Sequence, residues 1–241
     1  MSAGLSTPVP PDRSIVQPFL ETETERLLAT VGALRRTDLT EDSSLPGWTL
    51  GHLLTHVARN ADALCNLLQW AHTGIESPMY SSRQQRNDDI DRGATRPGDV
   101  VIADVIDSAA RFRAAADGLA PADWTREVVT AQGRTIPAAQ VPWLRLREVA
   151  IHHVDLGASF DDMAPGLVAA LLDDVVNSVR TKSGWPGVRI ETTEGDSFDI
   201  GSPTVDIKGA QAHLLAWLTG RSPGRELVTP SERLPDLPAW L

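Results

Sequence analysis

The sequence is short of cysteine, of basic residues and of long apolar runs, and each shortage excludes a class of protein. Cys65 is the single cysteine among 241 residues, which excludes an internal disulfide and is typical of a reducing compartment. The 22 basic residues against 32 acidic ones leave a net charge of −10, which argues against nucleic-acid and anionic-membrane partners, because either would need a basic face. No apolar run approaches the length of a membrane span, and the first residues contain no secretory apolar segment. We therefore expect a cytoplasmic protein without nucleic-acid or membrane partners.

Apolar residues recur at helical spacing through most of the first 160 positions. This spacing predicts helices at about 15–36, 49–71, 81–92, 98–118 and 143–157. Thr49 is a favourable N-cap residue, and Gly157 is a favourable glycine at a helix C-terminus. Between the last two of these helices, the stretch around Gln132 and Gly133 predicts a β-hairpin or an extended excursion.

The pattern changes after Pro165, where a helix at about 167–181 precedes short strand-like runs. The runs GVRIETT, SFDIG and TVDIKG are separated by EGD and SP turns, and a last helix is predicted at about 210–218. The sequence therefore predicts an α+β protein. Its N-terminal helical bundle would occupy residues 1–163, and a smaller C-terminal α+β domain would occupy residues 164–241.

A polar stripe interrupts the apolar stretch WLRLREVAIHHVDLG, which places Glu148 four residues before His152 and five before His153. Residues four apart share a helix face, whereas His153 is turned about 140° from Glu148 at 100° per residue. Arg145 and Asp155 extend the stripe, either as partners of a ligand or as surface charges. From this helix alone a solvated ion pair is the simpler interpretation, and half of a metal site is the alternative.

The helix predicted at 49–71 carries His52 and His56, which are also four residues apart. His56 has apolar neighbours on its own face, and a histidine in such a position is more often a satisfied core residue than a ligand. Facing helices of one bundle can nevertheless direct side chains to one point. His56, Glu148 and His152 would then resemble the three protein ligands of a catalytic zinc site with one open position. The spacing alone leaves both interpretations open.

Several stretches resemble the mycothiol-dependent maleylpyruvate isomerases, within the wider DinB-like metalloprotein superfamily. They are PGWTLGHLLTHVARNADALCNLLQWAHTG, SPMYSSRQQRNDDI, VVTAQGRTIPA, REVAIHHVDLG and the closing PAWL. The resemblance implies a DinB-like four-helix bundle at the N-terminus. It also implies that the metal ligands are the histidine eight residues after the tryptophan of PGW, here His56, and the acid and histidine of REVxxH, here Glu148 and His152. Zinc (Zn²⁺) suits this set together with a thiol, although other divalent ions can occupy it.

The resemblance further implies the cis-to-trans isomerisation of maleylpyruvate to fumarylpyruvate, a step of gentisate-type aromatic degradation, with mycothiol as the thiol cofactor. Cys65 lies nine residues after His56, about 180° around the helix, so we expect it to pack rather than to supply the thiol. Another mycothiol-dependent S-transferase, or a DinB-like hydrolase that activates water, would need the same ligands. A non-catalytic thiol- or metal-binding module is a further alternative. We expect a monomer.

Two arginines are candidates for binding the carboxylates of the substrate, because guanidinium groups bind carboxylates bidentately. Arg86, in RQQRNDDI, matches the substrate-binding arginine of the family and is also a candidate catalytic residue. Arg221, in the TGRSPG loop, is a second candidate, with an ordinary solvated arginine as the alternative. His52, one turn before His56, is either a catalytic residue that orients a ligand or the substrate, or a residue that caps or packs its helix.

Overall fold

The computed structural model describes residues 12–35, 37–180, 182–231 and 233–240. These residues form two compact units, which divide between Gly157 and Ala158. Helices and small β-sheets both occur, so the predicted α+β class is confirmed. A domain boundary at residues 163/164 stays a prediction, and we propose that the two units are separate domains. In the described part of the chain, no helix combines the length and the apolar character needed to cross a bilayer.

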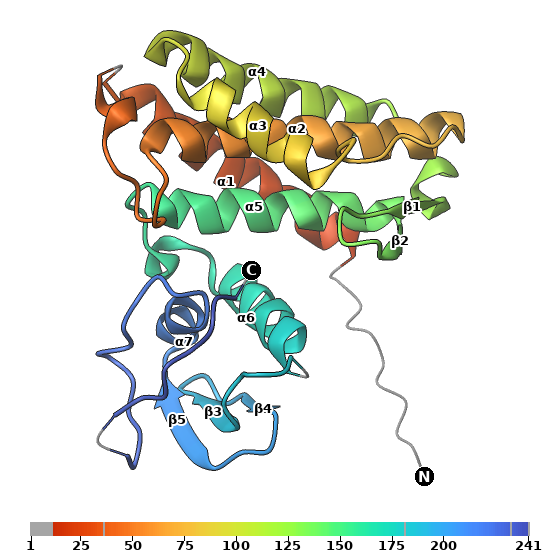
Figure 1. Ribbon diagram of the computed structural model, residues 1–241. Helices are drawn as coiled ribbons and strands as arrows, with labels where there is room; N and C mark the ends of the chain where they lie inside the picture. The colour runs from red at the N-terminus through yellow and green to blue at the C-terminus, as the bar shows by residue number, and fades with distance from the viewer. Residues whose placement is uncertain (1–11, 36, 181, 232, 241) are drawn as a thin grey trace. The chain divides into compact units, whose positions relative to one another are not determined.

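The N-terminal unit is a helical bundle (Figure 1). Its helices are α1 (Arg13–Ala33), α2 (Leu50–Thr73), α3 (Arg83–Ala94), α4 (Gly98–Asp117) and α5 (Val141–Asp155). α2 packs against α3, α4 and α5, and α1 packs against α4 and α5. The apolar stripes of the four long helices meet in one core, which includes Leu27, Val31, Leu53, Leu54, Val57, Val101, Val105 and Val149. The predicted four-helix bundle is therefore confirmed, with α3 as an additional short helix.

Local sequence signals explain where α2 begins and ends. The Thr49 side chain accepts a hydrogen bond from the backbone N–H of His52, and the His52 ring accepts one from the backbone N–H of Thr49. This reciprocal arrangement is a capping box with a histidine in the place of the usual glutamate. At the other end Gly74 takes a left-handed conformation, with φ of 73°, which glycine adopts without steric cost.

α3 lies close to α2, and Gly93 permits the approach. A methyl group added at Gly93 would lie 2.3 Å from Cγ2 of Thr55 on α2. α3 is otherwise polar, and Ile90 and Gly93 are its buried residues. The short helix is thus attached to the bundle along one narrow face, which places its first turns over the middle of α2 (Figure 1).

The stretch before α5 is a hairpin, which decides between the two predicted alternatives. β1 (Glu127–Val129) and β2 (Thr135–Pro137) pair antiparallel, and the connecting turn places Gly133 at φ of 76°. Val128 and Ile136 face each other in the pairing and are both buried, so the hairpin is attached to the bundle by its inner face.

The second unit contains α6 (Pro165–Val179), α7 (Gln211–Leu218) and a three-stranded sheet. The strand order is β4 (Ser197–Ile200), β3 (Val188–Thr192), β5 (Val205–Gly209), with β3 antiparallel to β4 and parallel to β5. α6 and α7 pack on each other and contact the sheet. The tail returns to α6, where the indole N–H of Trp240 donates to Ser178 Oγ at 2.9 Å. The predicted helices and strands of this region are confirmed.

Candidate metal centre

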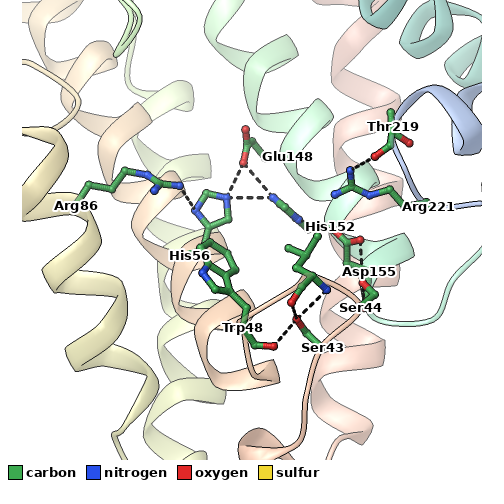
Figure 2. A network of polar contacts seen from close by, with 11 residues as sticks. Ser43, Ser44, Trp48, His56, Arg86, Glu148, His152, Asp155, Thr219 and Arg221 are labelled. Atoms are coloured by element: carbon green, nitrogen blue, oxygen red, sulfur yellow. Dashed lines mark hydrogen bonds and ion pairs between the residues drawn. The ribbon is translucent and has the colours of Figure 1, made fainter. Parts of the chain in front are cut away.

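Three side chains from two helices converge in the N-terminal unit (Figure 2). His56 extends from α2, and Glu148 and His152 extend from α5. His56 Nε2 lies 3.1 Å from Glu148 Oε2 and 3.0 Å from His152 Nε2, and His152 Nε2 lies 3.5 Å from Glu148 Oε2. The sequence left open whether His56 is a core histidine and whether Glu148 and His152 form a surface ion pair. The structure brings all three residues together.

The spacing of these atoms suits a small divalent cation. Ligand atoms placed tetrahedrally around zinc at about 2.0–2.1 Å lie about 3.3 Å from one another, close to the separations observed here. The donors are two imidazole nitrogens and one carboxylate oxygen, a set that zinc accepts. The side chains of Glu148 and His152 are 17% and 13% exposed, so small molecules can reach the open side of the set.

The sequence of α5 places its polar stripe inside the bundle rather than on the surface. Arg145, one turn before Glu148, is 1% exposed, and its Nη1 donates to Val57 O at 2.8 Å and to Asn60 Oδ1 at 3.0 Å on α2. Burial lowers the pKa of Arg145 to about 10, so the guanidinium still carries its charge at neutral pH. The interpretation of Arg145 as a surface charge is wrong, because the side chain links the two helices that carry the ligands.

Asp155 fixes the orientation of the His152 ring. Its Oδ2 lies 2.8 Å from His152 Nδ1, and its Oδ1 accepts from Ser44 Oγ at 3.0 Å. An ionised carboxylate only accepts hydrogen bonds, so Nδ1 of His152 carries the proton and Nε2 is directed toward His56 and Glu148. Carboxylate–histidine–metal triads have this arrangement. Asp155 is 5% exposed, so a surface charge is the wrong interpretation here as well.

The charges of the ligand set are strongly coupled. Burial alone would raise the pKa of Glu148, but hydrogen bonds from His152 and His56 hold it well below its ordinary value. Burial likewise opposes the charged form of His152, and the hydrogen bonds with Asp155 and Glu148 outweigh it and raise the pKa of that ring. The carboxylate is therefore ionised at neutral pH, and a cation that binds competes with any proton on His152.

His56 lies between Trp48 and Arg86. The Trp48 and His56 rings are tilted by 59° with centroids 5.4 Å apart, and burial lowers the pKa of His56. Arg86 Nη2 lies 3.2 Å from His56 Nδ1, and arginine only donates, so in this arrangement the proton of the neutral ring is on Nε2 (Figure 2). A cation on Nε2 needs the proton on Nδ1 instead. Arg86 and a bound cation therefore favour opposite tautomers of His56.

Sequence reasoning missed one residue beside Arg86. Tyr80 is the single tyrosine of the chain, and the Arg86 guanidinium carbon lies 5.9 Å from the centre of its ring. Burial raises the pKa of Tyr80, and the charges of Arg86 and Glu148 also act on its hydroxyl. The available signal was its position in SPMYSSRQQRNDDI, the same stretch that supplied Arg86.

The remaining candidates lie in different surroundings. His52 caps α2, with its Nδ1 2.8 Å from Thr49 Oγ1, which favours the capping interpretation, and its catalytic role stays a prediction. Arg221 follows α7 in the second unit, where its Nη1 donates to Thr219 O at 2.6 Å, and its role in substrate binding stays a prediction. His153 is buried on the far side of α5, with Nε2 2.8 Å from Thr30 Oγ1.

The chain is similar to proteins of one known family. The family model described as the mycothiol maleylpyruvate isomerase N-terminal domain matches residues 20–157. The crystal structure of a mycothiol-dependent maleylpyruvate isomerase is similar over 100% of both chains, with a TM-score of 0.90 and 31% sequence identity. The crystal structure of a histidine-to-alanine mutant of a mycothiol-dependent maleylpyruvate isomerase gives the same values. No curated protein sequence matches the chain. The chain belongs to the mycothiol-dependent maleylpyruvate isomerase family.

Proposed function

We propose that this protein isomerises maleylpyruvate to fumarylpyruvate with mycothiol as its thiol cofactor and a divalent metal, zinc by preference, held by His56, Glu148 and His152. The observation that carries the proposal is the convergence of these three side chains within 3.5 Å of one another, in a chain that belongs to the family. Two similar crystal structures are named as mycothiol-dependent maleylpyruvate isomerases.

The reaction needs a thiolate because a carbon–carbon double bond does not rotate at ambient temperature. A bound thiol cofactor would supply reversible addition to the double bond, with the electron pair taken up by the neighbouring carbonyl group, so that a rotatable single bond would exist until elimination restored the double bond in the trans form. A divalent metal held by His56, Glu148 and His152 would lower the thiol pKa, as this chemistry requires at neutral pH.

The residues of the chain hold and orient the participants. Glu148 contributes the negative charge of the ligand set, and Asp155 keeps the Nε2 atom of His152 directed to the site. Arg86 reaches the edge of the set through His56 and offers a planar, charge-assisted contact for a substrate carboxylate. A second carboxylate contact from Arg221, and a catalytic role for His52, are part of the proposal.

The cysteine of the chain is unsuited to the role of the thiol. Cys65 is partly buried on α2, and burial raises the pKa of its thiol to about 11. At neutral pH the sulfur is therefore protonated and weakly nucleophilic. An external thiol cofactor supplies the nucleophile instead. We further propose that the protein takes part in aromatic degradation and is a cytoplasmic monomer.

A coupled assay tests the proposed function. Purified protein of measured metal content is given maleylpyruvate with and without mycothiol, and formation of fumarylpyruvate is followed. We expect turnover only with mycothiol, and loss of both metal and turnover in His56→Ala, Glu148→Ala and His152→Ala. His153→Gln, at the neighbouring buried histidine, is the control and should retain both. Metal-loaded protein that leaves maleylpyruvate unchanged in the presence of mycothiol would refute the proposal and favour a different thiol transfer or a hydrolysis.

A further inference from the structure

A cavity of about 250 Å³ lies beside the candidate metal centre. Side chains from α2, from α3 and from the loop between them form its walls. Among these are Arg59, Asp62, Asn66, Tyr80, Gln85 and Arg86. The ligand set and Cys65 do not belong to this lining, so the cavity is a separate feature that adjoins the site.

The cavity begins where the ligand set ends. Arg86 lines the cavity, and its Nη2 is also 3.2 Å from Nδ1 of the candidate ligand His56. Ala63, which lines the cavity as well, follows His56 by seven residues and so lies two turns further along nearly the same face of α2. A molecule with one end at the ligand set can therefore pass Arg86 and place its other end in the cavity.

The loop that closes the cavity is held in place before any ligand binds. Asn66 Nδ2 donates to Pro78 O at 3.2 Å and to Met79 O at 3.4 Å. From the other side, the backbone N–H of Ala131 in the β-hairpin turn contacts Met79 Sδ at 3.2 Å. These contacts attach the loop both to α2 and to the hairpin, so the cavity is largely preformed, as small-ligand sites usually are.

Two arginines and two aspartates line the cavity, so away from Arg86 its charges do not favour an anionic occupant. Arg59 Nη2 forms ion pairs with the two carboxylate oxygens of Asp104, at 2.7 and 2.8 Å, and with Asp62 Oδ2, at 3.0 Å. Asp62 also pairs with Arg111, and Asp89 pairs with Arg92, so these ion pairs offer no free cation to a dicarboxylate. Apart from Arg86, which also faces His56, the remaining polar groups of the lining are amides, hydroxyls and carboxylates. A hydroxyl group both donates and accepts hydrogen bonds, so a polyhydroxylated, uncharged ring is the ligand that such a mixture binds best.

We propose that this cavity binds the polyhydroxylated part of the thiol cofactor, while the sulfur of the cofactor lies at the candidate metal centre. This inference rests on the proposed function. Mycothiol carries its N-acetylcysteine on a glucosamine–inositol unit, which is rich in hydroxyl groups and lacks anionic groups. The volume fits part of that unit, because cavities for whole drug-sized ligands measure about 300–1,000 Å³.

Two neighbouring glutamines offer a matched pair of variants. Gln85 lines the cavity, and its Nε2 donates to Asp89 Oδ1 at 2.9 Å. Gln84 is also exposed on α3 and donates to Asp88 Oδ1 at 2.7 Å, but it is not part of the lining. Gln85→Trp places an indole in the cavity, and Gln84→Trp makes the same change on the same helix outside it.

Binding is measured by calorimetry on metal-loaded protein, with mycothiol and with N-acetylcysteine, which lacks the sugar and inositol rings. We expect the wild type to bind mycothiol at least about tenfold more tightly than N-acetylcysteine. Gln85→Trp should remove most of that difference by weakening mycothiol binding alone, and Gln84→Trp should preserve it. In turnover, Gln85→Trp should raise KM for mycothiol and leave KM for maleylpyruvate unchanged.

Equal affinity of the wild type for the two thiols would overturn the inference without any variant. An increase of KM for maleylpyruvate alone in Gln85→Trp would assign the cavity to the substrate instead and would equally overturn it. The proposed function fails separately, if the wild type binds mycothiol but leaves maleylpyruvate unchanged.

Discussion

The contact between Asp155 and His152 gives the sharpest test of the candidate metal centre. The carboxylate side chain is 1% exposed, and its two oxygens face His152 Nδ1 at 2.8 Å and Ser44 Oγ at 3.0 Å. Asp155→Asn preserves the shape, since the amide oxygen can still accept from Nδ1 and the amide nitrogen can donate to the hydroxyl of Ser44. The variant therefore removes the charge that makes His152 a stronger ligand, and little else.

A carboxylate that accepts a hydrogen bond from a metal-ligating histidine usually raises metal affinity about 10–100-fold, or by about 1.4–2.8 kcal/mol. Asp155→Asn keeps the hydrogen bond, so we expect a loss of about tenfold, near the lower limit. Asp155→Ala leaves the Nδ1–H of His152 without this acceptor and opens a gap beside the ring, so we expect a loss of about 100-fold.

Metal affinity is measured by competition with a chelator of known affinity, and folding is checked by circular dichroism. His153→Gln is the control, because that ring is buried one residue along the same helix and contacts Thr30 instead. We expect the control to bind metal like the wild type. A folded Asp155→Ala variant with unchanged metal affinity would refute the role assigned to Asp155.

Three further predictions concern the substrate, the cysteine and pH. Arg86→Ala should bind metal at least as tightly as the wild type, because the competing contact to His56 is gone. Its kcat/KM should fall about 100-fold, with partial recovery in Arg86→Lys. An unchanged kcat/KM would make Arg86 an ordinary surface residue. Cys65→Ala should retain mycothiol-dependent turnover, and a folded, metal-loaded variant without turnover would contradict the external-thiol mechanism. The pKa of His152 is raised above the ordinary histidine value of about 6.5, so as the pH falls toward and below that value a proton on His152 should compete with the metal and lower the metal affinity. A metal affinity independent of pH between 5 and 8 would show that His152 is not a ligand.

Helix positions were predictable from the sequence because each helix carries its own signals. α2 begins after the N-cap residue Thr49 and ends before Gly74. The apolar spacing of the long helices identifies the faces that meet in the core. The ends differ by a few residues from those predicted: α1 ends at Ala33 and α6 at Val179. Such ends depend on contacts between distant segments as well as on local preference.

The candidate site was predictable in part only. The spacing of Glu148 and His152 placed them on one face, but nothing local shows that this face is covered by α2. For the same reason Arg145 and Asp155 could not be distinguished from surface charges, since their partners Val57 and Ser44 lie far away in the sequence. The cavity beside the site was beyond prediction, because it is formed by a loop whose path depends on Asn66 and the hairpin.

The buried guanidinium of Arg145 has a consequence for how the candidate metal centre would be formed. Arg145 lies one turn before Glu148 on α5 and donates a hydrogen bond to the backbone oxygen of Val57, the residue after His56 on α2. This contact stabilises the register of the two helices that the ligand set requires. Sliding α5 along α2 by one turn would separate this charge from its acceptors inside the bundle, a costly change. The contact therefore favours the register that brings the three side chains together, whichever ion they bind. The identity of the metal in a cell would then follow the relative supply and affinity of the available ions, while the protein remains the same.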